Sequence, residues 1–586
     1  MISRDWASSH RRLTSYWLLI LVVALGALAS RVPRLKIRPM HTDEAVHADK
    51  FGTLLEEGRY EYDPDEYHGP TLNYFTLIPA WLSGARTYTR ITEVTVRIVP
   101  VVFGVLLILL TVLAADGLGA AGVWTALLTA VSPAMFYYSR YYIQETLLVC
   151  FTFGAIVSGY RYSRSRALPW AVATGVFLGL MHATKETCII ALGAMGLALV
   201  VVVLCERWKG RPVRECFKVA KPAHLGLAVV AAICVSALFY SSFLTRPRGV
   251  LDSYATYATY FGRAGGGGED TTHVHAWHYY LRMLLYARYG SGPVWTEGWI
   301  VLLAVVGYAV AVTGKGAGAM DVRLLRFLAF YTLSMTVVYS AIPYKTPWCL
   351  LGFLHGIILL AGVGATALLR WARRPVARVP LVLLLGAAVT HLAFQAYRGS
   401  YVYGSDSRNP YVYAHPTPEV FTVAEIVKEY AGLYDDPCDL TVQVACAGHD
   451  YWPLPWYLRF YNGGYSNALP DQVGPLIFVS EEMEGALGRR LYTETPPERR
   501  QMYLYVFDEP YYVWFRPQVK LVGFVRKDLW EAYQSELVVR EAVKEYTEAT
   551  SRGAEPNMVD FLARYPGLDE EIRRRIGLPS RTSEGP

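Results

Sequence analysis

The sequence predicts a polytopic α-helical membrane protein with about eleven transmembrane helices, followed by an α/β domain outside the membrane. Three observations support this fold class. Of the 586 residues, 53% are hydrophobic, which indicates a large membrane-embedded part. Apolar segments of about the length needed to cross a bilayer recur through residues 1–397. From about Arg398 onward the pattern changes to short alternating elements, which are typical of a small α/β domain.

The apolar segments divide the first 397 residues into spans and loops. The first of them has no small-residue cleavage pattern behind it, so we interpret it as a retained helix and not as a signal peptide. The expected spans are Tyr16–Val32, Val94–Ala114, Leu118–Tyr138, Tyr142–Tyr160, Leu168–Ala183, Thr187–Cys205, Pro222–Phe243, Gly298–Thr313, Leu325–Ile342, Trp348–Leu369 and Val379–Ala396.

Basic residues predict the orientation of these spans. Clusters of Lys and Arg precede the first span and recur in every second loop, for example from Arg207 to Lys221, and such loops favour the cytoplasm. The amino terminus is therefore expected on the cytoplasmic side of the plasma (inner) membrane and the domain 398–586 on its outer side. If the segment Thr71–Gly84 crossed the membrane, every later loop would lie on the opposite side and the basic clusters would be outside. We therefore expect this segment to be an interfacial or re-entrant helix. The net charge of +7 is spread over separate loops, which excludes a nucleic-acid-binding face.

Two long loops are expected on the outer side, residues 33–93 and 244–297. The first begins with the motif His41-Thr42-Asp43-Glu44, which places two adjacent carboxylates at the bilayer surface. The residues from Thr42 to Leu55 form an amphipathic pattern that predicts an interfacial helix, capped by Thr42 or Asp43. Such a helix would hold both carboxylates at the depth of the lipid headgroups.

The domain 398–586 is expected to combine helices and strands. Its cysteines Cys438 and Cys446 flank a probable strand and are too far apart to bridge each other. The expected elements are a helix over Pro418–Leu433, a strand over Leu440–Ala445, an aromatic helix in Trp452–Arg459, a strand over Leu476–Ser480, a helix over Glu481–Arg489, a strand over Met502–Phe507, and charged helices from Lys527 to the end.

Three short outer connections each contain one basic residue, namely Arg140, Lys185 and Lys345. An unpaired charge at the edge of an apolar span is costly. A phosphate or pyrophosphate at headgroup depth would be a natural partner for it. The alternatives are snorkelling to the interface and salt bridges to nearby acids such as Glu145 and Glu186.

Other polar residues on the outer side are candidates for the same site. Glu145 lies close to the outer end of its span, where it either pairs with Arg140 or supplies a second carboxylate for acid–base or metal chemistry. His68 opens the interfacial segment and is a candidate for binding substrate. His41, Asp43 and Glu145 are residue types that bind divalent metals, but no ligand spacing fixes a metal site. Metal dependence therefore stays open.

Together these motifs resemble the GT-C membrane glycosyltransferases, most of all glycosyltransferase family 39, the relatives of protein O-mannosyltransferases. The resemblance rests on the acidic pair after the first span, Arg140 and Glu145 five residues apart, and the outer lysines. Within that class, four local motifs resemble a prokaryotic branch associated with flippase activity. They are His41-Thr-Asp-Glu-Ala45, Tyr67-His-Gly-Pro70, Tyr344-Lys-Thr-Pro-Trp348 and Trp452-Pro-Leu-Pro-Trp-Tyr-Leu-Arg459.

The resemblance implies an inverting transfer of a hexose from a polyprenyl-phosphate donor to a lipid, glycan or protein acceptor on the non-cytoplasmic face. It implies Asp43 as the general base and Glu44 as a residue that orients it or binds the sugar, although the sequence leaves open which acid is the base. Arg140, Lys185 and Lys345 would bind the departing lipid phosphate. The residues expected to contact substrate are His68, Glu145, Tyr344 and Trp348.

Two other functions compete with this hypothesis. One is a flippase, or a flippase-associated transporter, without transferase activity. A transporter would carry ionisable residues near the midplane and internally repeated helices, whereas the charges here lie at the outer boundary and no repeat is visible. The other is an assembly subunit in which Asp43 only caps a helix. That function explains the acid but leaves the three outer cations unexplained.

Overall fold

The computed structural model describes residues 2–65, 68–210, 221–264, 273–553 and 556–579. The chain divides into two compact units, Met1–His415 and Pro416–Pro586. The sequence places the domain boundary at 397/398, whereas the structure keeps residues 398–415 with the first unit. Each unit is described by itself below.

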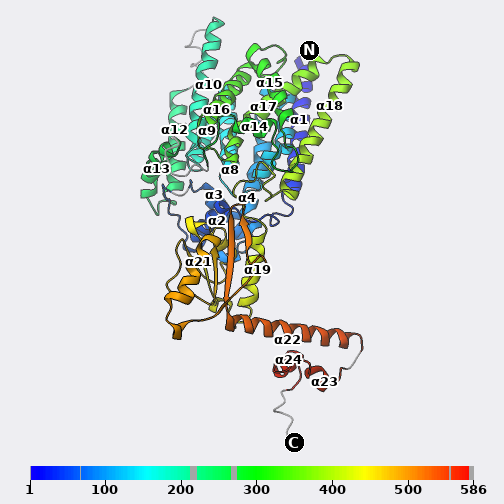
Figure 1. Ribbon diagram of the computed structural model, residues 1–586. Helices are drawn as coiled ribbons and strands as arrows, with labels where there is room; N and C mark the ends of the chain where they lie inside the picture. Colours follow the sequence, from blue (N-terminus) through cyan, green and yellow to red (C-terminus); the bar gives the residue numbers. More distant parts are fainter. Residues whose placement is uncertain (1, 66–67, 211–220, 265–272, 554–555, 580–586) are drawn as a thin grey trace. The chain divides into compact units, whose positions relative to one another are not determined.

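The first unit is a bundle of apolar helices (Figure 1). A helix covers most of each segment that the sequence predicts to span the membrane. These helices are α1 (Ile2–Arg31), α4 (Glu93–Leu110) continued by α5 (Ala115–Leu118), α6 (Ala120–Val131) with α7 (Pro133–Tyr138), α8 (Glu145–Ser165), α9 (Leu168–His182), α10 (Cys188–Trp208), α12 (Pro222–Tyr240), α15 (Gly298–Thr313), α16 (Val322–Ala341), α17 (Leu351–Trp371) and α18 (Pro375–Tyr397).

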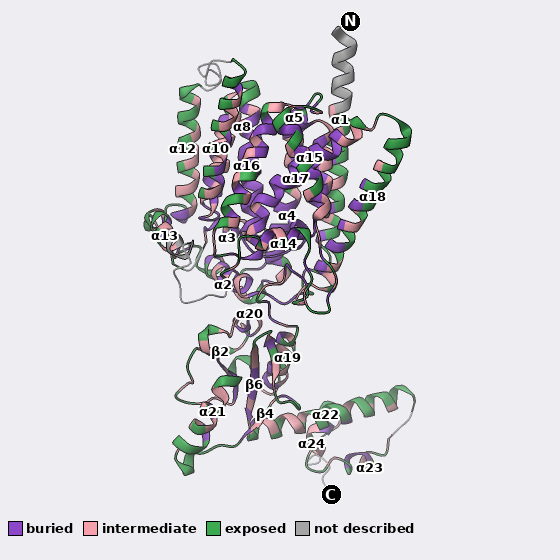
Figure 2. Ribbon diagram, turned by 45° about the horizontal axis from the view of Figure 1, so that its top comes forward, coloured by how far each residue is buried: buried purple, intermediate pink, exposed green. Residues whose placement is uncertain are grey.

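The helices confirm a multi-pass membrane protein. Within the described residues, seven candidate spans are long and apolar enough to cross a bilayer, and three further apolar helices are shorter. The total of eleven spans stays a prediction. Helices α8 and α17 are buried in the middle of the bundle, whereas α12 and α18 expose most of their surface to the surroundings (Figure 2). Those exposed apolar faces are suited to contact with lipid.

Small residues allow the central helices to pack closely. A Cβ atom on Gly307 of α15 would lie 1.9 Å from the carbonyl oxygen of Leu360 on α17, and one on Gly364 would lie 2.0 Å from that of Leu303. Only glycine fits at either position. This contact follows the rule for membrane helices, in which small residues let backbones approach and dispersion forces replace the hydrophobic effect.

Short helices gather at the end of the bundle opposite the start of α1 (Figure 1). They are α2 (Thr42–Glu57), α3 (Thr71–Leu82), α13 (Arg248–Ala264) and α14 (Tyr279–Leu285). Helix α3 has 12 residues, which is shorter than a spanning helix requires. These segments come from the two long loops that the sequence predicts on the outer side. Residues 66–67 and 265–272 of those loops lie outside the described residues.

Buried hydrogen bonds hold residues 398–415 on the first unit. The hydroxyl of Tyr411 donates to Glu297 at 2.9 Å, and the hydroxyl of Tyr138 donates to the carbonyl of Tyr411, also at 2.9 Å. Glu297 is fully buried and also accepts hydrogen bonds from Ser132 and from the backbone of Ala134. The chain therefore leaves the bundle only after His415.

The second unit is an α/β domain around one six-stranded sheet in the order β2-β1-β3-β6-β4, with β5 also paired to β6. β1 runs parallel to β2 and β3, whereas β6 is antiparallel to β3, β4 and β5. The strands are β1 (Thr441–Ala445), β2 (Asn462–Ser466), β3 (Leu476–Ser480), β4 (Tyr503–Tyr505), β5 (Val513–Arg516) and β6 (Val519–Arg526). The helices are α19 (Glu419–Ala431), α20 (Leu454–Tyr457), α21 (Glu481–Arg489), α22 (Lys527–Ser551), α23 (Met558–Leu562) and α24 (Asp569–Arg575).

The elements that form the core of this unit, α19, β1 and β3, are predicted from the sequence, whereas β2 is not. Val420, Val423 and Val427 of α19 are fully buried in one core cluster with residues of β1 and β3. The strand β3 (Leu-Ile-Phe-Val-Ser) is a nearly continuous apolar run, which is typical of a strand covered on both faces, whereas β1 (Thr-Val-Gln-Val-Ala) alternates polar and apolar residues over most of its length. β2 lacks such a signal because its sequence Asn-Gly-Gly-Tyr-Ser is polar and rich in glycine, so only its pairing with β1 defines it as a strand.

Candidate active site

His41 fixes the start of α2. Its backbone is extended and its Nδ1 accepts a hydrogen bond from the backbone N–H of Asp43 at 3.0 Å. The side chain of Glu44 in turn accepts from the backbone N–H of His41 at 3.1 Å, which completes a capping box. The prediction that Thr42 or Asp43 caps this helix is therefore wrong. Because an imidazole satisfies the helix end, the carboxylate of Asp43 is not used for capping.

Glu44 lies at the centre of a buried cluster of arginines. Its carboxylate accepts hydrogen bonds from both Nε and Nη2 of Arg97, at 2.8 and 2.7 Å, and from Nη2 of Arg38 at 3.0 Å. The backbone N–H groups of His41 and Tyr142 complete the shell of this fully buried side chain. The parallel N–H groups of Arg97 form a bidentate pair, the strongest arrangement for binding a carboxylate.

Charge neutralisation keeps Glu44 ionised. Burial alone would raise the pKa of its carboxyl group, but the positive charges of Arg38 and Arg97 lower the pKa to about 2. All five surrounding N–H groups donate hydrogen bonds to this carboxylate. Glu44 is therefore a poor base for a substrate at neutral pH. We infer that it anchors the start of α2 to α4 and to the segment after α7.

Asp43 differs from its neighbour in exposure and in partners. Its side chain is 42% exposed, and its nearest charged neighbour within the described residues is His41, whose Nδ1 lies 3.7 Å from Oδ1. Burial raises the pKa of Asp43, but the charges of His41, His47, His68 and Lys185 outweigh that effect and lower it. Among these groups Lys185 is charged at neutral pH, because the charge of Glu145 raises its pKa. Asp43 is therefore an ionised and accessible carboxylate.

Two buried ion pairs contribute to the surroundings of Asp43. Lys185 is paired with Glu145, and both side chains are 6% exposed. Burial lowers the pKa of Lys185, but the charge of Glu145 raises it above its usual value. The second oxygen of Glu145 has no hydrogen-bond partner in the described part of the chain. The alternative that Glu145 pairs with Arg140 is therefore wrong, and its free oxygen is available to a substrate.

His68 forms the second pair. Its Nδ1 lies 2.8 Å from Glu186, which also accepts a hydrogen bond from Tyr62 at 3.1 Å. The ring of His68 is centred 6.1 Å from that of His47 on α2. Burial, followed by the charge of His68, lowers the pKa of His47 to about 3, so this imidazole stays neutral. Asp43, His68, Glu145 and Lys185 therefore belong to one polar cluster.

Lys345 lies next to a row of ring side chains that begins at His41, which we call the aromatic wall. It consists of His41, Trp348, Tyr413, His273 and Tyr344. The ammonium group of Lys345 donates to the carbonyls of His275 and Ile342, and burial lowers its pKa. Lys345 forms no ion pair with a carboxylate among the residues that the structure describes. Buried positive charge held by carbonyl oxygens alone favours an anion as a further partner.

Hydrogen bonds and ring contacts connect this wall to Asp43. Nε2 of His41 lies 2.9 Å from the carbonyl oxygen of Tyr413, and its ring is centred 5.7 Å from that of Trp348. The hydroxyl of Tyr413 lies 2.7 Å from His273, whose ring is centred 4.8 Å from that of Tyr344. Trp348 is buried, whereas Tyr344 is 38% exposed. The wall extends from the base of α2 to Lys345.

Arg140 lies in a different environment from Lys185 and Lys345. Its Nη2 donates to the carbonyls of Pro33 and Arg34, at 2.7 and 3.2 Å, and its guanidinium stacks 4.1 Å from the ring of Tyr401. These neighbours belong to the segment after α1 and to the chain after α18. Of the three outer cations, Lys185 acts on the charge of Asp43, whereas Lys345 lies beside the aromatic wall.

The sequence interpretation overlooked the partners of Glu44. Arg97 is a charged residue inside the apolar segment Val94–Ala114, and an ionisable residue inside a membrane span is a known signal of function or pairing. Arg38, Tyr413 and His273 carry no such signal, because they lie in polar loops. Among the described residues, no three His, Cys, Asp or Glu side chains are grouped as a metal site.

The fold and these comparisons define the class of the protein. It is a multi-pass membrane protein with a GT-C-like fold. Residues 76–240 match the family model described as dolichyl-phosphate-mannose-protein mannosyltransferase. No curated protein matches the chain significantly in sequence.

Solved structures share this fold at low sequence identity. The crystal structure of ArnT from Cupriavidus metallidurans bound to undecaprenyl phosphate is similar with a TM-score of 0.57 and 16% identity, covering 87% of this chain and 98% of that chain. The archaeal oligosaccharyltransferase AglB from Archaeoglobus fulgidus, in complex with an inhibitory peptide and a dolichol-phosphate, is similar with a TM-score of 0.50 and 13% identity. It covers 98% of this chain, and 87% of AglB is matched.

Proposed function

We propose that this protein is a glycosyltransferase that moves a sugar from a polyprenyl-phosphate donor to a lipid, glycan or protein acceptor, with Asp43 as the general base. One observation carries the proposal. Asp43 is an ionised, half-exposed carboxylate on a helix whose start is fixed by its fully bound neighbour Glu44. A carboxylate that is held in place but not bound is what deprotonation of an acceptor hydroxyl requires. The GT-C fold and the match to a mannosyltransferase family model support the class of reaction.

The reaction proceeds as a single displacement. The acceptor hydroxyl donates a hydrogen bond to Asp43 and transfers its proton there while its oxygen attacks the anomeric carbon. The bond between that carbon and the phosphate oxygen breaks, and the lipid phosphate leaves with the electron pair. Because attack and departure occur on opposite faces of the sugar, the configuration inverts. Asp43 then releases the proton to water.

Lys345 stabilises the leaving phosphate in this proposal. Negative charge develops on the phosphate in the transition state, and a fixed cation that is poorly hydrated interacts with it strongly. Lys185 lowers the pKa of Asp43 and, with Glu145 and His68, lines the space where the sugar binds. Tyr344 and Trp348 supply aromatic surface for the sugar or the first isoprene units. Arg140 is not assigned to the donor, because its contacts lie with Pro33, Arg34 and Tyr401.

The substitution Asp43→Asn tests the proposal directly. It keeps the size of the side chain and removes its capacity as a base, so we expect transfer to fall by about 10²–10⁴-fold. The measurement is transfer from a radiolabelled polyprenyl-phosphate sugar by the purified full-length protein. Asp49→Asn, an exposed position on the same helix, is the matched control and should retain full activity. Near-normal transfer by Asp43→Asn would exclude Asp43 as the base.

The same variant separates the transferase from a flippase. A flippase without transferase activity would not depend on a base, so Asp43→Asn would leave it active. Mass spectrometry of lipid-linked and protein-linked glycans from cells carrying Asp43→Asn identifies the sugar and acceptor that are missing. A set of lipid-linked and protein-linked glycans identical to that of the wild type would favour the flippase.

The proposed orientation places the amino terminus in the cytoplasm and α2 outside it. A reporter fused after Gly404, on the last segment of the first unit, should be active only outside the cytoplasm. Cytoplasmic activity of the fusion would reverse the orientation and place Asp43 on the wrong face for a polyprenyl-phosphate donor presented outside.

A further inference from the structure

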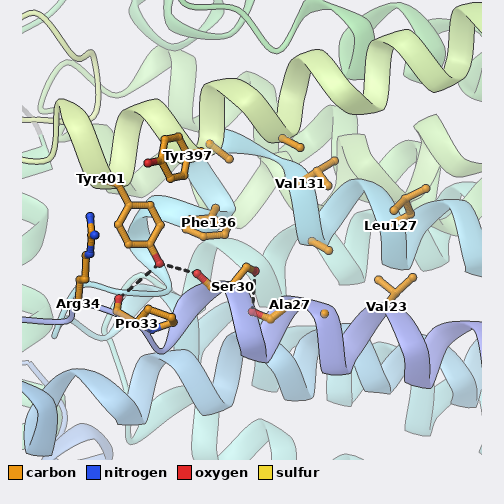
Figure 3. Close-up of a pocket in the computed structure, with 14 residues that line it drawn as sticks. Val23, Ala27, Ser30, Pro33, Arg34, Leu127, Val131, Phe136, Tyr397 and Tyr401 are labelled. Atoms are coloured by element: carbon orange, nitrogen blue, oxygen red, sulfur yellow. Dashed lines mark hydrogen bonds between the residues drawn. The ribbon is translucent and has the colours of Figure 1, made fainter.

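An apolar groove of about 630 Å³ runs along α1 on the side of α6, α7 and α18 (Figure 3). Its walls are aliphatic and aromatic along most of their length, with Val23 and Ala27 on α1 facing Leu127, Val131 and Phe136. A cavity of this size is within the range that binds drug-sized ligands. Its apolar lining favours a hydrocarbon chain as the occupant.

One end of the groove is polar and positively charged. Arg34 and Tyr401 line it there, beside Ser30 and Pro33 (Figure 3). The hydroxyl of Tyr401 donates to the carbonyls of Ser30 and Pro33, at 2.5 and 3.4 Å. The guanidinium of Arg34 forms no hydrogen bond or ion pair with any residue that the structure describes. An amphiphile with an anionic headgroup matches this change from apolar to cationic lining.

Arg140 does not line the groove itself but adds a second, buried charge next to Tyr401 at this end. Its guanidinium lies over the ring of Tyr401, and its side chain is more than nine-tenths buried, but its Nε and Nη1 have no hydrogen-bond partner within the described chain. Snorkelling of a cation to water does not explain such a buried residue. The carboxylate of Glu44 does not neutralise it, because Arg38 and Arg97 already occupy that carboxylate. The end of the groove therefore has an excess of positive charge.

The groove is nearly as long as one bilayer leaflet is thick. From Val23 to Arg31 the helix α1 rises by about 12 Å, and the groove continues past the end of α1 to Arg34, whereas half of the hydrocarbon thickness of a bilayer is about 15 Å. The outer surfaces of α1 and α18 are mostly exposed, so the groove is bordered by faces that contact lipid. No residue that lines it belongs to the cluster around Asp43 or to the wall of Lys345.

We propose that this groove binds an anionic phospholipid of the leaflet on the side of Asp43. An acyl chain lies between α1 and α18, and the phosphate interacts with Arg34 and Arg140. The sugar donor is a less suitable occupant, because no residue that lines the groove belongs to the cluster around Asp43. Phospholipid is also the most abundant amphiphile next to the exposed helices, so mass action favours it. The proposal is independent of the transfer reaction.

Filling the groove tests this proposal without touching the active site. Gly26 lines the groove, and a Cβ atom there would meet no atom within 4 Å, so Gly26→Trp places a large side chain in open space. Gly196→Trp on α10 is the matched control, since Gly196 also faces open space and lies outside the groove. Arg34→Gln removes the exposed charge and keeps the groove open.

The measurement is native mass spectrometry of the delipidated full-length protein titrated with dioleoyl-phosphatidylglycerol, dioleoyl-phosphatidylcholine or undecaprenyl phosphate. We expect retention of phosphatidylglycerol to fall about tenfold in Gly26→Trp and to be unchanged in Gly196→Trp. Arg34→Gln should reduce the preference for phosphatidylglycerol over phosphatidylcholine about fivefold. Equal retention by the two tryptophan variants would overturn the site. Displacement of phosphatidylglycerol by tenfold less undecaprenyl phosphate, lost in Gly26→Trp, would overturn the assigned occupant.

Discussion

Asp43 and Glu44 are adjacent in the sequence but belong to two different regions of the molecule. Glu44 faces a buried, arginine-rich region formed by α4 and the segments after α1 and α7, where five N–H groups bind its carboxylate. Asp43 faces a region of histidines and lysines and is 42% exposed. Successive helical residues point about 100° apart around the axis. One turn of α2 therefore supplies both an anchor and a candidate base.

Under the proposed function, this difference explains how a reactive carboxylate is held in place at the start of α2. A base must remain accessible and must not move, and one residue cannot easily meet both needs. Here the buried neighbour provides rigidity through charge-assisted hydrogen bonds. The exposed residue is then free to bind the substrate. The predictions below test this division between the two regions.

The largest expected difference lies in the stability of the two amide variants. Glu44→Gln leaves two buried arginines without an anion, so we expect a loss of about 3–5 kcal/mol in the free energy of unfolding. Asp43→Asn should change it by less than about 0.5 kcal/mol, because the side chain is half-exposed and accepts no strong hydrogen bond. Thermal unfolding of both variants in the same detergent measures the difference. Equal melting temperatures would contradict the assigned roles.

Acid should weaken the arginine-rich region first. The pKa of Glu44 is about 2 in the folded protein, against 4.5 ordinarily. A carboxyl group with a lowered pKa contributes stability that is complete above pH 4.5 and is lost as the pH falls toward 2, by about 3 kcal/mol in total. Unfolding followed from pH 6 to pH 2 should show this loss in the wild type but not in Glu44→Gln. A parallel decline in both proteins would assign it to other carboxyl groups.

A smaller effect is expected from Lys345, which affects transfer more than stability. Lys345→Met removes the cation that we propose to bind the leaving phosphate, so kcat/KM should fall about ten- to hundredfold, corresponding to about 1.5–3 kcal/mol. Inhibition by undecaprenyl phosphate should weaken in parallel. Lys345→Arg should recover part of both. Lys315→Met, in a connection between α15 and α16, is the control. If inhibition is unchanged in Lys345→Met, the phosphate lies elsewhere.

The smallest effect is expected from removal of metal. Both ring nitrogens of His41 are engaged, one by the backbone of Asp43 and the other by Tyr413, and Glu145 is paired with Lys185. We therefore expect EDTA to change the rate of transfer by less than about twofold. A rate that falls with EDTA and returns on addition of Mn²⁺ or Mg²⁺ would show that these residues rearrange around an ion when substrate binds.

Much of the fold could be predicted from the sequence because apolar length and periodicity are local properties. Helices cover most of every predicted span, and the β-rich residues of β1 and β3 predict both strands. The strand β2 could not be predicted in the same way, since its only defining property is its pairing with β1. The boundary after His415 also depends on a distant contact, between Tyr411 and Glu297.

For the site, the sequence by itself determined that acids and cations gather at one end of the helical bundle, because charges are costly within apolar spans. Only the tertiary structure decided how they pair. In the folded protein Glu44 pairs with Arg38 and Arg97, and Glu145 pairs with Lys185. Arg140 lies against Tyr401, beside the groove between α1 and α18. These pairings join residues up to 261 positions apart, as with Arg140 and Tyr401. Which charges meet depends on how the helices pack, and no local pattern in the sequence specifies that.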